Sequence, residues 1–157
     1  MAVLTQTDDQ DIAVRRAARR DSWLGILSVF AVVWGLLNLV GLALSMMQTP
    51  ETLARGFTPD QVAYILDTPA WVRICHAVSV VCLLVGAVQL QLRREAAYRW
   101  LMGSIFAMLG LMVDGMLRGG FELLSSLTTG MNLGYIVVGI FLFWAALSAK
   151  QTGQLRA

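Results

Sequence analysis

Charged residues are scarce in this chain of 157 residues, at 14%, whereas hydrophobic residues make up 57%. Soluble domains carry about 25% charged and about 45–50% apolar residues. A soluble protein as apolar as this one would expose large patches that promote aggregation. The formal net charge is only +2, and no basic surface for nucleic acid is evident, so we expect no nucleic-acid partner.

Residue types that carry most catalytic and metal chemistry are equally few, with one His and two Cys. No nucleophilic triad, phosphate-binding loop, dinucleotide fingerprint or zinc motif occurs in the sequence. Cys75 and Cys82 are seven residues apart, which on a helix is about 10 Å and beyond the reach of a disulfide. We therefore expect the chain not to be an enzyme and to hold no cofactor or metal.

A copper site is the alternative left open, because sulfur side chains gather towards one side of the expected fold, beside Cys75 and His76. The methionines concerned are Met46, Met47, Met112, Met116 and Met131. Soft sulfur ligands together with an imidazole suit Cu(I). However, no Cys-x-x-Cys or Met-x-x-Met spacing is present, and methionine is common in ordinary apolar packing.

Long apolar stretches are what the chain has in abundance, and four of them are uncharged or nearly so. They cover 22–47, 74–92, 100–113 and 123–149. About 20 apolar residues in a helix cross the hydrocarbon core of a bilayer. We therefore expect an all-α integral membrane protein, a four-transmembrane-helix bundle in the lipid bilayer that forms a single domain over 1–157. The expected spans are about 22–47, 71–92, 98–118 and 126–149.

The distribution of basic residues predicts how these spans are oriented. Nine of the twelve lie before the first span, between the second and third, or after the fourth. Because cytoplasmic segments are enriched in Lys and Arg, we expect a multi-pass protein of a bacterial inner membrane with both termini in the cytoplasm. The nine are Arg15, Arg16, Arg19, Arg20, Arg93, Arg94, Arg99, Lys150 and Arg156, and the other three are Arg55, Arg73 and Arg118.

A further helix is expected before the first span. Thr7 and Gln10 have the spacing of a capping box, which predicts a cytoplasmic helix over 8–21. Asp8 and Asp9 would lie in its first turn, where the helix dipole favours acidic side chains. This helix is expected to run directly into the first span.

All three prolines lie in the connection between the first two spans, which we expect on the outer side, and each follows a threonine. Threonine at the N-cap with proline at the first helical position is a helix-start signal. Thr58, Pro59 and Gln61 predict a short helix over 59–66, and Thr68–Pro69 predicts a start that leads through Trp71 into the second span. The short helix is interpreted either as a lid or as the ordered part of a loop.

Asp114 is the most unusual residue, because an ionisable group within a membrane helix is costly unless it is paired. Arg118 lies four residues later and Glu122 eight, so one helix face would carry an acid, a base and an acid. Two interpretations follow. Asp114 and Arg118 form a structural ion pair that orients the third span, or Asp114 is part of a functional site.

Polar side chains from the other spans are expected at the same depth as Asp114. Asn38 lies in the outer half of the first span, Arg73 and His76 begin the second, and Asn132 begins the fourth. With Asp114 and Arg118, these residues predict either an outward-facing polar pocket or a structural hydrogen-bond network.

Pairs of small residues four apart allow close approach of helices in lipid. They occur at 41 and 45, 103 and 107, and 130 and 134. We therefore expect an accessory or structural protein that assembles with itself or with a larger membrane complex. The alternative is a small transporter or ligand-binding membrane protein that uses the polar pocket around Asp114.

The stretch FTPDQVAYILDTPAW at 57–71, an Arg-Arg turn at 93–94 and a third span after it resemble a family of small four-span bacterial membrane proteins. Members carry a Thr-Pro-acid helix start and a Pro-Ala-Trp start of the second span. Some bear the automatic label of sugar transporter, and the family is otherwise uncharacterised. The resemblance covers about 22–118. It implies the topology and a structured outer loop, and it implies no catalytic or binding residue.

Cysteine labelling tests the predicted orientation. After replacement of the two native cysteines, cysteines introduced at Glu51 and Asp60 should react with a membrane-impermeant reagent in intact cells, because both lie in the outer connection. A cysteine at Glu95 should react only after the membrane is permeabilised. Labelling of Glu95 in intact cells would reverse the orientation.

Overall fold

The computed structural model describes residues 3–124 and 126–156, without the side chains at 3–21, 126–129 and 131–132. The described residues form seven helices and no strand beyond one isolated bridge. The helices are α1 (Val3–Met46), α2 (Pro50–Leu53), α3 (Pro59–Leu66), α4 (Ala70–Gln91), α5 (Ala96–Leu117), α6 (Gly120–Leu123) and α7 (Ser126–Gln151).

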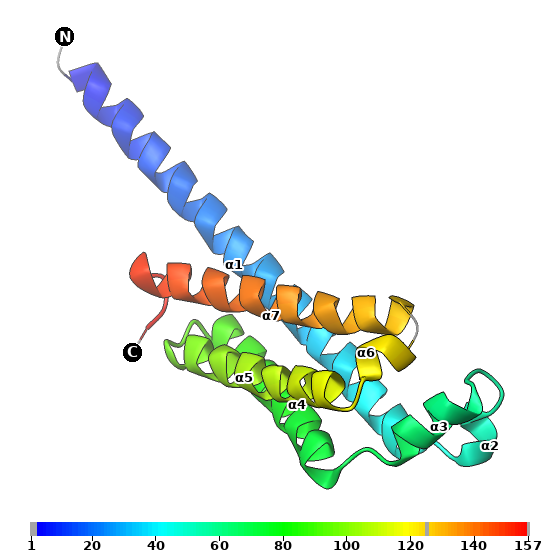
Figure 1. Cartoon of the computed structure of the whole chain (residues 1–157). Coiled ribbons are helices and arrows are strands. Elements are labelled where there is room, and N and C mark those ends of the chain that lie inside the picture. Colours follow the sequence, from blue (N-terminus) through cyan, green and yellow to red (C-terminus); the bar gives the residue numbers. More distant parts are fainter. Residues whose placement is uncertain (1–2, 125, 157) are drawn as a thin grey trace.

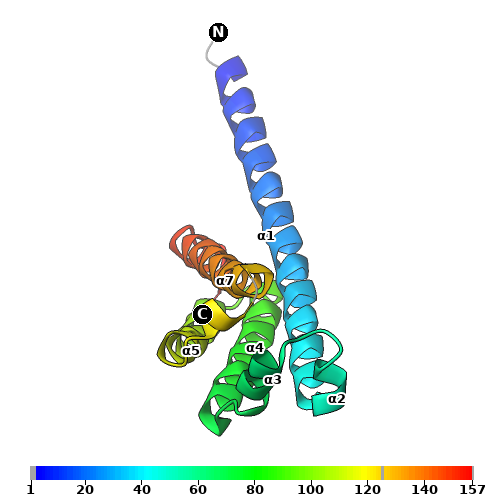
Figure 2. The same cartoon turned by 45° about the vertical axis from the view of Figure 1, so that its right-hand side comes forward.

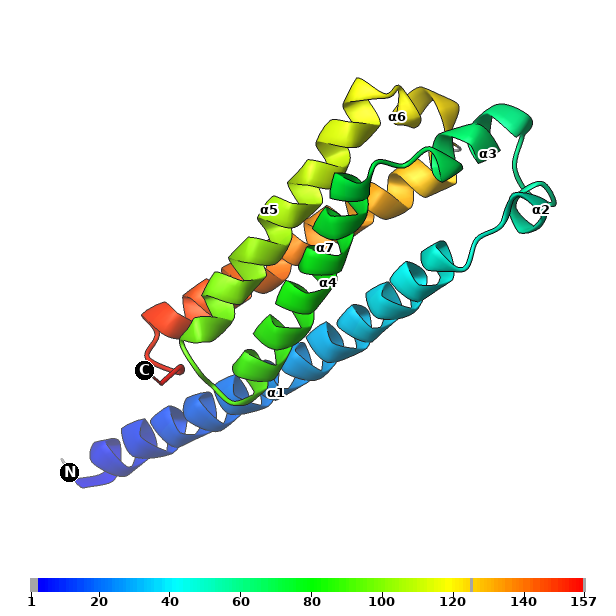
Figure 3. The ribbon, with the colours of Figure 1, turned by 90° about the horizontal axis from the view of Figure 1, so that it is seen from below.

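Four of these helices are long and apolar enough to cross a membrane, which indicates a multi-pass membrane protein. The qualifying segments are Ser22–Met46, Ala70–Gln91, Ala96–Leu117 and Leu133–Gln151. The four helices run alternately up and down (Figure 3). Both termini and the α4–α5 turn lie at one end of the bundle, here called the terminal end. The helices α2, α3 and α6 lie at the other, here called the loop end.

The first helix is longer than the others, and its N-terminal part extends beyond the rest of the bundle (Figures 1 and 2). It includes 8–21 without a break. Because α1 begins at Val3, Thr7 lies inside the helix and is not its N-cap as the capping-box pattern predicts.

Small residues let α4 and α5 pack closely as an antiparallel pair. A Cβ added at Gly110 would lie 3.1 Å from the Cys75 sulfur, so only glycine fits there without a shift. Nearer the bundle centre, the buried Ser104 hydroxyl donates to the Ser79 carbonyl oxygen at 3.0 Å. In turn, α1 packs mainly on α4, α7 packs mainly on α5, and α1 and α7 touch only sparsely.

The continuous apolar core lies in the terminal half of the bundle, where all four long helices contribute to it. Ser28 at this level donates to the Gln91 side chain, which satisfies a polar group inside the core. The core residues are Leu24, Leu27, Ala31, Leu83, Ala87, Leu90, Ala97, Leu101, Leu142, Ala145, Ala146, Ala149 and Leu155.

The C-terminal tail ties α7 to the α4–α5 turn. The Arg156 amide donates to the Arg93 carbonyl at 2.6 Å, and the Glu95 amide donates to the Arg156 carbonyl at 2.8 Å. Lys150 lies 3.4 Å from the Glu95 carboxylate. These contacts hold the terminal end together, because they join the end of α7 and the tail after it to the turn that connects α4 and α5.

At the loop end, α3 occupies the residues for which the sequence predicts a short helix. Thr58 is its N-cap, Pro59 its first residue, and Gln61 completes a capping box with Thr58. The predicted start at Thr68 is wrong by one residue. Pro69 is the N-cap of α4. The Thr68 hydroxyl does not cap α4 and instead donates to the Ile65 carbonyl oxygen at 2.7 Å.

The acid–base–acid face expected on the third span is also wrong at its last member. The helix α5 ends at Leu117, and Gly119 adopts a left-handed conformation with φ of 67°. Glycine favours this conformation because it has no Cβ. The chain therefore turns before Glu122, which lies exposed on α6 and not below Arg118.

Candidate functional site

A cavity of about 300 Å³ occupies the loop half of the bundle, above the apolar core. It lies where α1 and α7 separate, so that all four long helices, α3 and α6 contribute to its wall. The lining residues are Asn38, Gly41, Tyr64, Thr68, Val72, His76, Ser79, Met108, Leu111, Met112, Asp114, Phe121, Leu124, Tyr135 and Ile136.

The polar residues predicted for an outer pocket only partly meet in this cavity. Asn38, His76 and Asp114 line it, and Arg118 contacts Asp114. Arg73 does not line it and borders a second cavity instead. Asn132 falls outside the described side chains.

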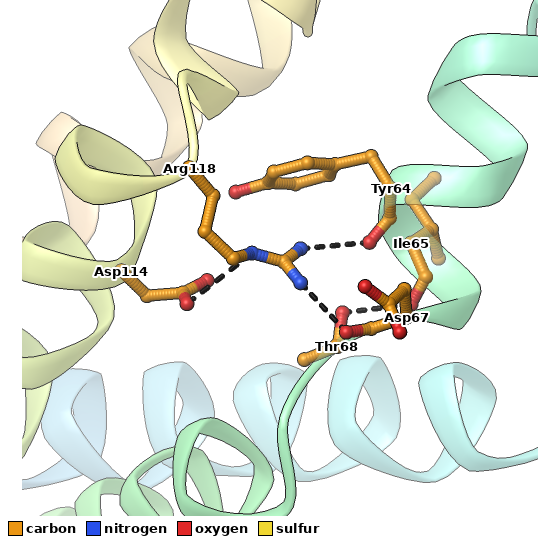
Figure 4. Close-up of polar contacts among 6 residues, drawn as sticks. All are labelled: Tyr64, Ile65, Asp67, Thr68, Asp114 and Arg118. Atoms are coloured by element: carbon orange, nitrogen blue, oxygen red, sulfur yellow. Dashed lines mark hydrogen bonds and ion pairs between the residues drawn. The ribbon is translucent and has the colours of Figure 1, made fainter.

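Asp114 is buried, with 5% of its surface exposed, and it pairs with Arg118 (Figure 4). The Arg118 Nε atom lies 3.3 Å from Asp114 Oδ1, across the i,i+4 spacing that the sequence predicts. That N–H does not point at an acceptor, since Nε has no hydrogen-bond partner among the described residues. The contact is therefore an ion pair, and the carboxylate keeps acceptor capacity on its cavity side.

The two terminal nitrogens of Arg118 reach the chain around α3. One donates to the Tyr64 carbonyl at 2.8 Å and the other to the Asp67 carbonyl at 2.7 Å (Figure 4). The guanidinium also lies over the Tyr64 ring, 4.1 Å from its centroid. Carbonyls at a helix C-terminus carry partial negative charge, which favours a cation there. Arg118 is therefore a clamp that joins α5 to α3.

Two further contacts hold α3 across the loop end of the bundle. The Gln61 side-chain amide donates to the Leu123 carbonyl at 2.8 Å, which joins α3 to the end of α6. The Tyr64 hydroxyl packs against Gly120 so closely that a Cβ at this position would collide with it. The cavity is thus covered from the loop end by α3, with Tyr64 forming part of its wall.

Two other cavity residues carry unused hydrogen-bonding capacity. Asn38 is 4% exposed, and its amide donates to the Trp34 carbonyl of its own helix at 2.8 Å, which leaves its amide oxygen as an acceptor. The half-buried His76 ring hydrogen-bonds to none of the described residues. Both groups can therefore form a further hydrogen bond on the cavity side.

Sequence reasoning missed Tyr64, Thr68, Ser79 and Tyr135, which all line the cavity. The sequence pattern places Tyr64 in the short helix and Thr68 at a helix start, but their inward position depends on how α3 folds back over the bundle. Ser79 lies three residues after His76 and its hydroxyl donates to the His76 carbonyl. That spacing puts both on one helical face and is the one signal available from the sequence.

The described sulfur side chains considered for copper are divided between two cavities and the surface: Met112 lines the first cavity with His76, and Met46 borders the second. Cys75 packs against Gly110 of α5. Met46, Met47 and Met116 are exposed on the surface of the bundle. Met131 falls outside the described side chains, and the residues described contain no cluster of three His, Cys, Asp or Glu.

Comparison of the chain with protein-family models, with curated proteins and with solved structures found no match.

Arg118 and Asp114 should differ in their effect on α3. We expect Arg118→Gln to lower stability in detergent by roughly 2–3 kcal/mol, because it loses two charge-assisted hydrogen bonds and leaves a buried carboxylate unpaired. Hydrogen exchange over 59–66 should become faster. Asp114→Asn should leave that exchange nearly unchanged, since Arg118 keeps both carbonyls. Thermal unfolding and hydrogen–deuterium exchange provide the two measurements.

The exposed Arg55 provides a matched control, because Arg55→Gln removes the same charge on the same side without touching α3. Equal protection of α3 in Arg118→Gln and Arg55→Gln would show that Arg118 is not a clamp.

Proposed function

We propose that the chain is a four-span protein of a bacterial inner membrane with both termini in the cytoplasm, related to the small four-span proteins that its loop motif resembles. The arrangement of basic residues supports this orientation. Nine of the twelve basic residues belong to the N-terminal part of α1, the α4–α5 turn with the first turn of α5, or the end of the chain, which are parts of the terminal end (Figure 3). The other three, Arg55, Arg73 and Arg118, belong to the connections and helix ends of the loop end. Basic residues favour the cytoplasmic side.

We further propose that it binds a small molecule in the cavity of the loop half. The cavity itself carries this proposal. Its volume of about 300 Å³ lies at the lower end of the range for ligand pockets, roughly 300–1,000 Å³. Its wall is mostly apolar with a few convergent polar groups, which is the usual composition of such pockets. The proposed role is binding or passage of the molecule, not catalysis.

The charges around the cavity favour a neutral ligand. The Asp114 carboxylate is already balanced by Arg118 at 3.3 Å, and a cationic ligand would have to compete with that guanidinium. The groups with spare capacity are mostly acceptors, namely the Asp114 carboxylate and the Asn38 amide oxygen. A compact molecule with one apolar side and one or two hydrogen-bond donors fits this wall.

Access from the loop end requires α3 to move, because it covers the cavity and is held by Arg118 and Gln61. These are three hydrogen bonds, one at the first turn of a short helix and two at its C-terminal end. Each contributes about 0.5–3 kcal/mol, which is small enough for opening on a functional timescale. The lid interpretation of this helix therefore belongs to the proposed binding function.

Filling the cavity should abolish binding. Met112 lines the cavity, so Met112→Trp should displace a bound molecule with little loss of folded protein. Met116 is one turn later on α5 and 66% exposed, so Met116→Trp is the matched control. The measurement is mass spectrometry of small molecules that co-purify with each variant in mild detergent.

A species enriched at least about tenfold with the wild type and Met116→Trp, and lost with Met112→Trp, is the expected result. A tenfold change corresponds to about 1.4 kcal/mol. Retention of every enriched species by Met112→Trp would contradict binding in this cavity.

A second candidate function is an accessory role, in which the protein assembles with itself or with a larger membrane complex. One observation favours it. A Cβ added at Gly130 or Gly134 of α7 would meet no atom of another element within 4 Å. Among the described residues this small-residue pair therefore makes no close helix contact, and it is available to a helix of another chain.

Gly134→Leu should weaken such an assembly without unfolding the protein, since a Cβ at this position meets no described atom within 4 Å. Gly25→Leu is the control, because Gly25 on α1 is equally open. Cross-linking in membranes followed by size measurement should show a smaller species for Gly134→Leu alone. An identical pattern for the wild type and both variants would exclude α7 as the contact.

A further inference from the structure

A second cavity of about 270 Å³ lies at the loop end, between the end of α1, the end of α3 and the start of α4. It shares Thr68, Val72, His76 and Leu111 with the first cavity, so the two are neighbours. Its other lining residues are Leu42, Ser45, Met46, Gln48, Ile65, Leu66 and Arg73.

Arg73 is the one charged residue among those that line this cavity. It lies in the first turn of α4, is exposed, and donates to the Leu66 carbonyl at 3.3 Å. It takes part in no ion pair with any described residue. Its positive charge therefore remains available beside an apolar cavity.

The depth of this cavity corresponds to the edge of a bilayer. Trp71 is two residues before Arg73 and is 44% exposed, and amphipathic aromatic side chains are enriched at the membrane–water interface. Beside it, the last turns of α1 contribute Leu42 and Met46 to the wall of the cavity, and Met46 is exposed. A cation at the rim with apolar surface beneath it matches an anionic lipid, whose phosphate lies above its acyl chains.

We propose that this cavity binds an anionic phospholipid of the surrounding bilayer. The phosphate lies at Arg73, and the upper part of one acyl chain lies between α1 and α3 against Leu42, Met46 and Leu66. A volume of about 270 Å³ is too small for a whole phospholipid, so only a part of the lipid would enter the cavity. The site is separate from the cavity of the proposed function, and its test is independent of that function.

An arginine at a helix end also reaches the interface without any specific lipid, by extending its side chain to the headgroups. The two cases differ in the role of the apolar cavity. A simple extension of Arg73 needs only its charge, whereas a bound lipid needs both the charge and the space below it.

The test uses the full chain in mild detergent, with phosphatidylglycerol and phosphatidylcholine of identical acyl chains added in turn. Native mass spectrometry measures the bound fraction. Phosphatidylglycerol should bind about fivefold more tightly, the factor for one basic residue that meets one anionic headgroup. Arg73→Gln should remove this preference, and Arg73→Lys should keep most of it.

Two further variants separate the site from general attraction. Ser45 lines the cavity, is exposed, and bonds only to the Leu42 carbonyl of its own helix, so Ser45→Phe should fill the space and weaken both lipids while Arg73 is intact. Arg55→Gln, which lines neither cavity, should change nothing. Equal binding of the two lipids by the wild type would overturn the proposal, and so would full phosphatidylglycerol binding by Ser45→Phe.

Discussion

The reach of Arg118 from the end of α5 to the carbonyls of α3 is the interaction on which the loop half of the molecule depends. Without it, the buried Asp114 carboxylate would have no countercharge among the described residues, and the Tyr64 and Asp67 carbonyls would lose the cation that they share. The same guanidinium covers the Tyr64 ring, which in turn rests on Gly120. One side chain thus couples the charge inside the bundle to the position of the helix that covers it.

The two halves of the bundle differ in how their centres are filled, with an apolar core in the terminal half and a cavity in the loop half. In the terminal half, Leu and Ala side chains from all four long helices fill the centre, and the tail contact between Arg156 and Arg93 joins the helix ends. In the loop half, α1 diverges from α7, and side chains alone do not fill the gap. Polar groups are tolerated there because they lie closer to water, where the cost of burying charge is lower.

Much of this arrangement could be predicted from residue patterns, and the failures have local causes. Apolar length predicts the four long helices, and the i,i+4 spacing predicts the contact of Asp114 with Arg118. The predicted position of Glu122 on the third span is wrong because the chain turns at Gly119, which has a positive φ. A glycine within an apolar helical pattern does not show from the sequence whether it will continue the helix or end it. Arg73 was expected in the pocket around Asp114 but borders the second cavity. The sequence shows how far along a helix a residue lies, but it does not show in which direction the side chain points. Tyr64 was missed because its inward position depends on tertiary contacts of α3.

The wall between the two cavities explains why Arg73 and Arg118 have different roles although both lie at the loop end. Thr68, Val72, His76 and Leu111 border both spaces, so the two cavities are neighbours. On one side of it, Arg118 is fully used by an acid and two carbonyls. On the other, Arg73 has a single backbone partner beside an apolar space. A guanidinium that is already neutralised organises the protein, whereas one that is not remains free to meet an anion from outside.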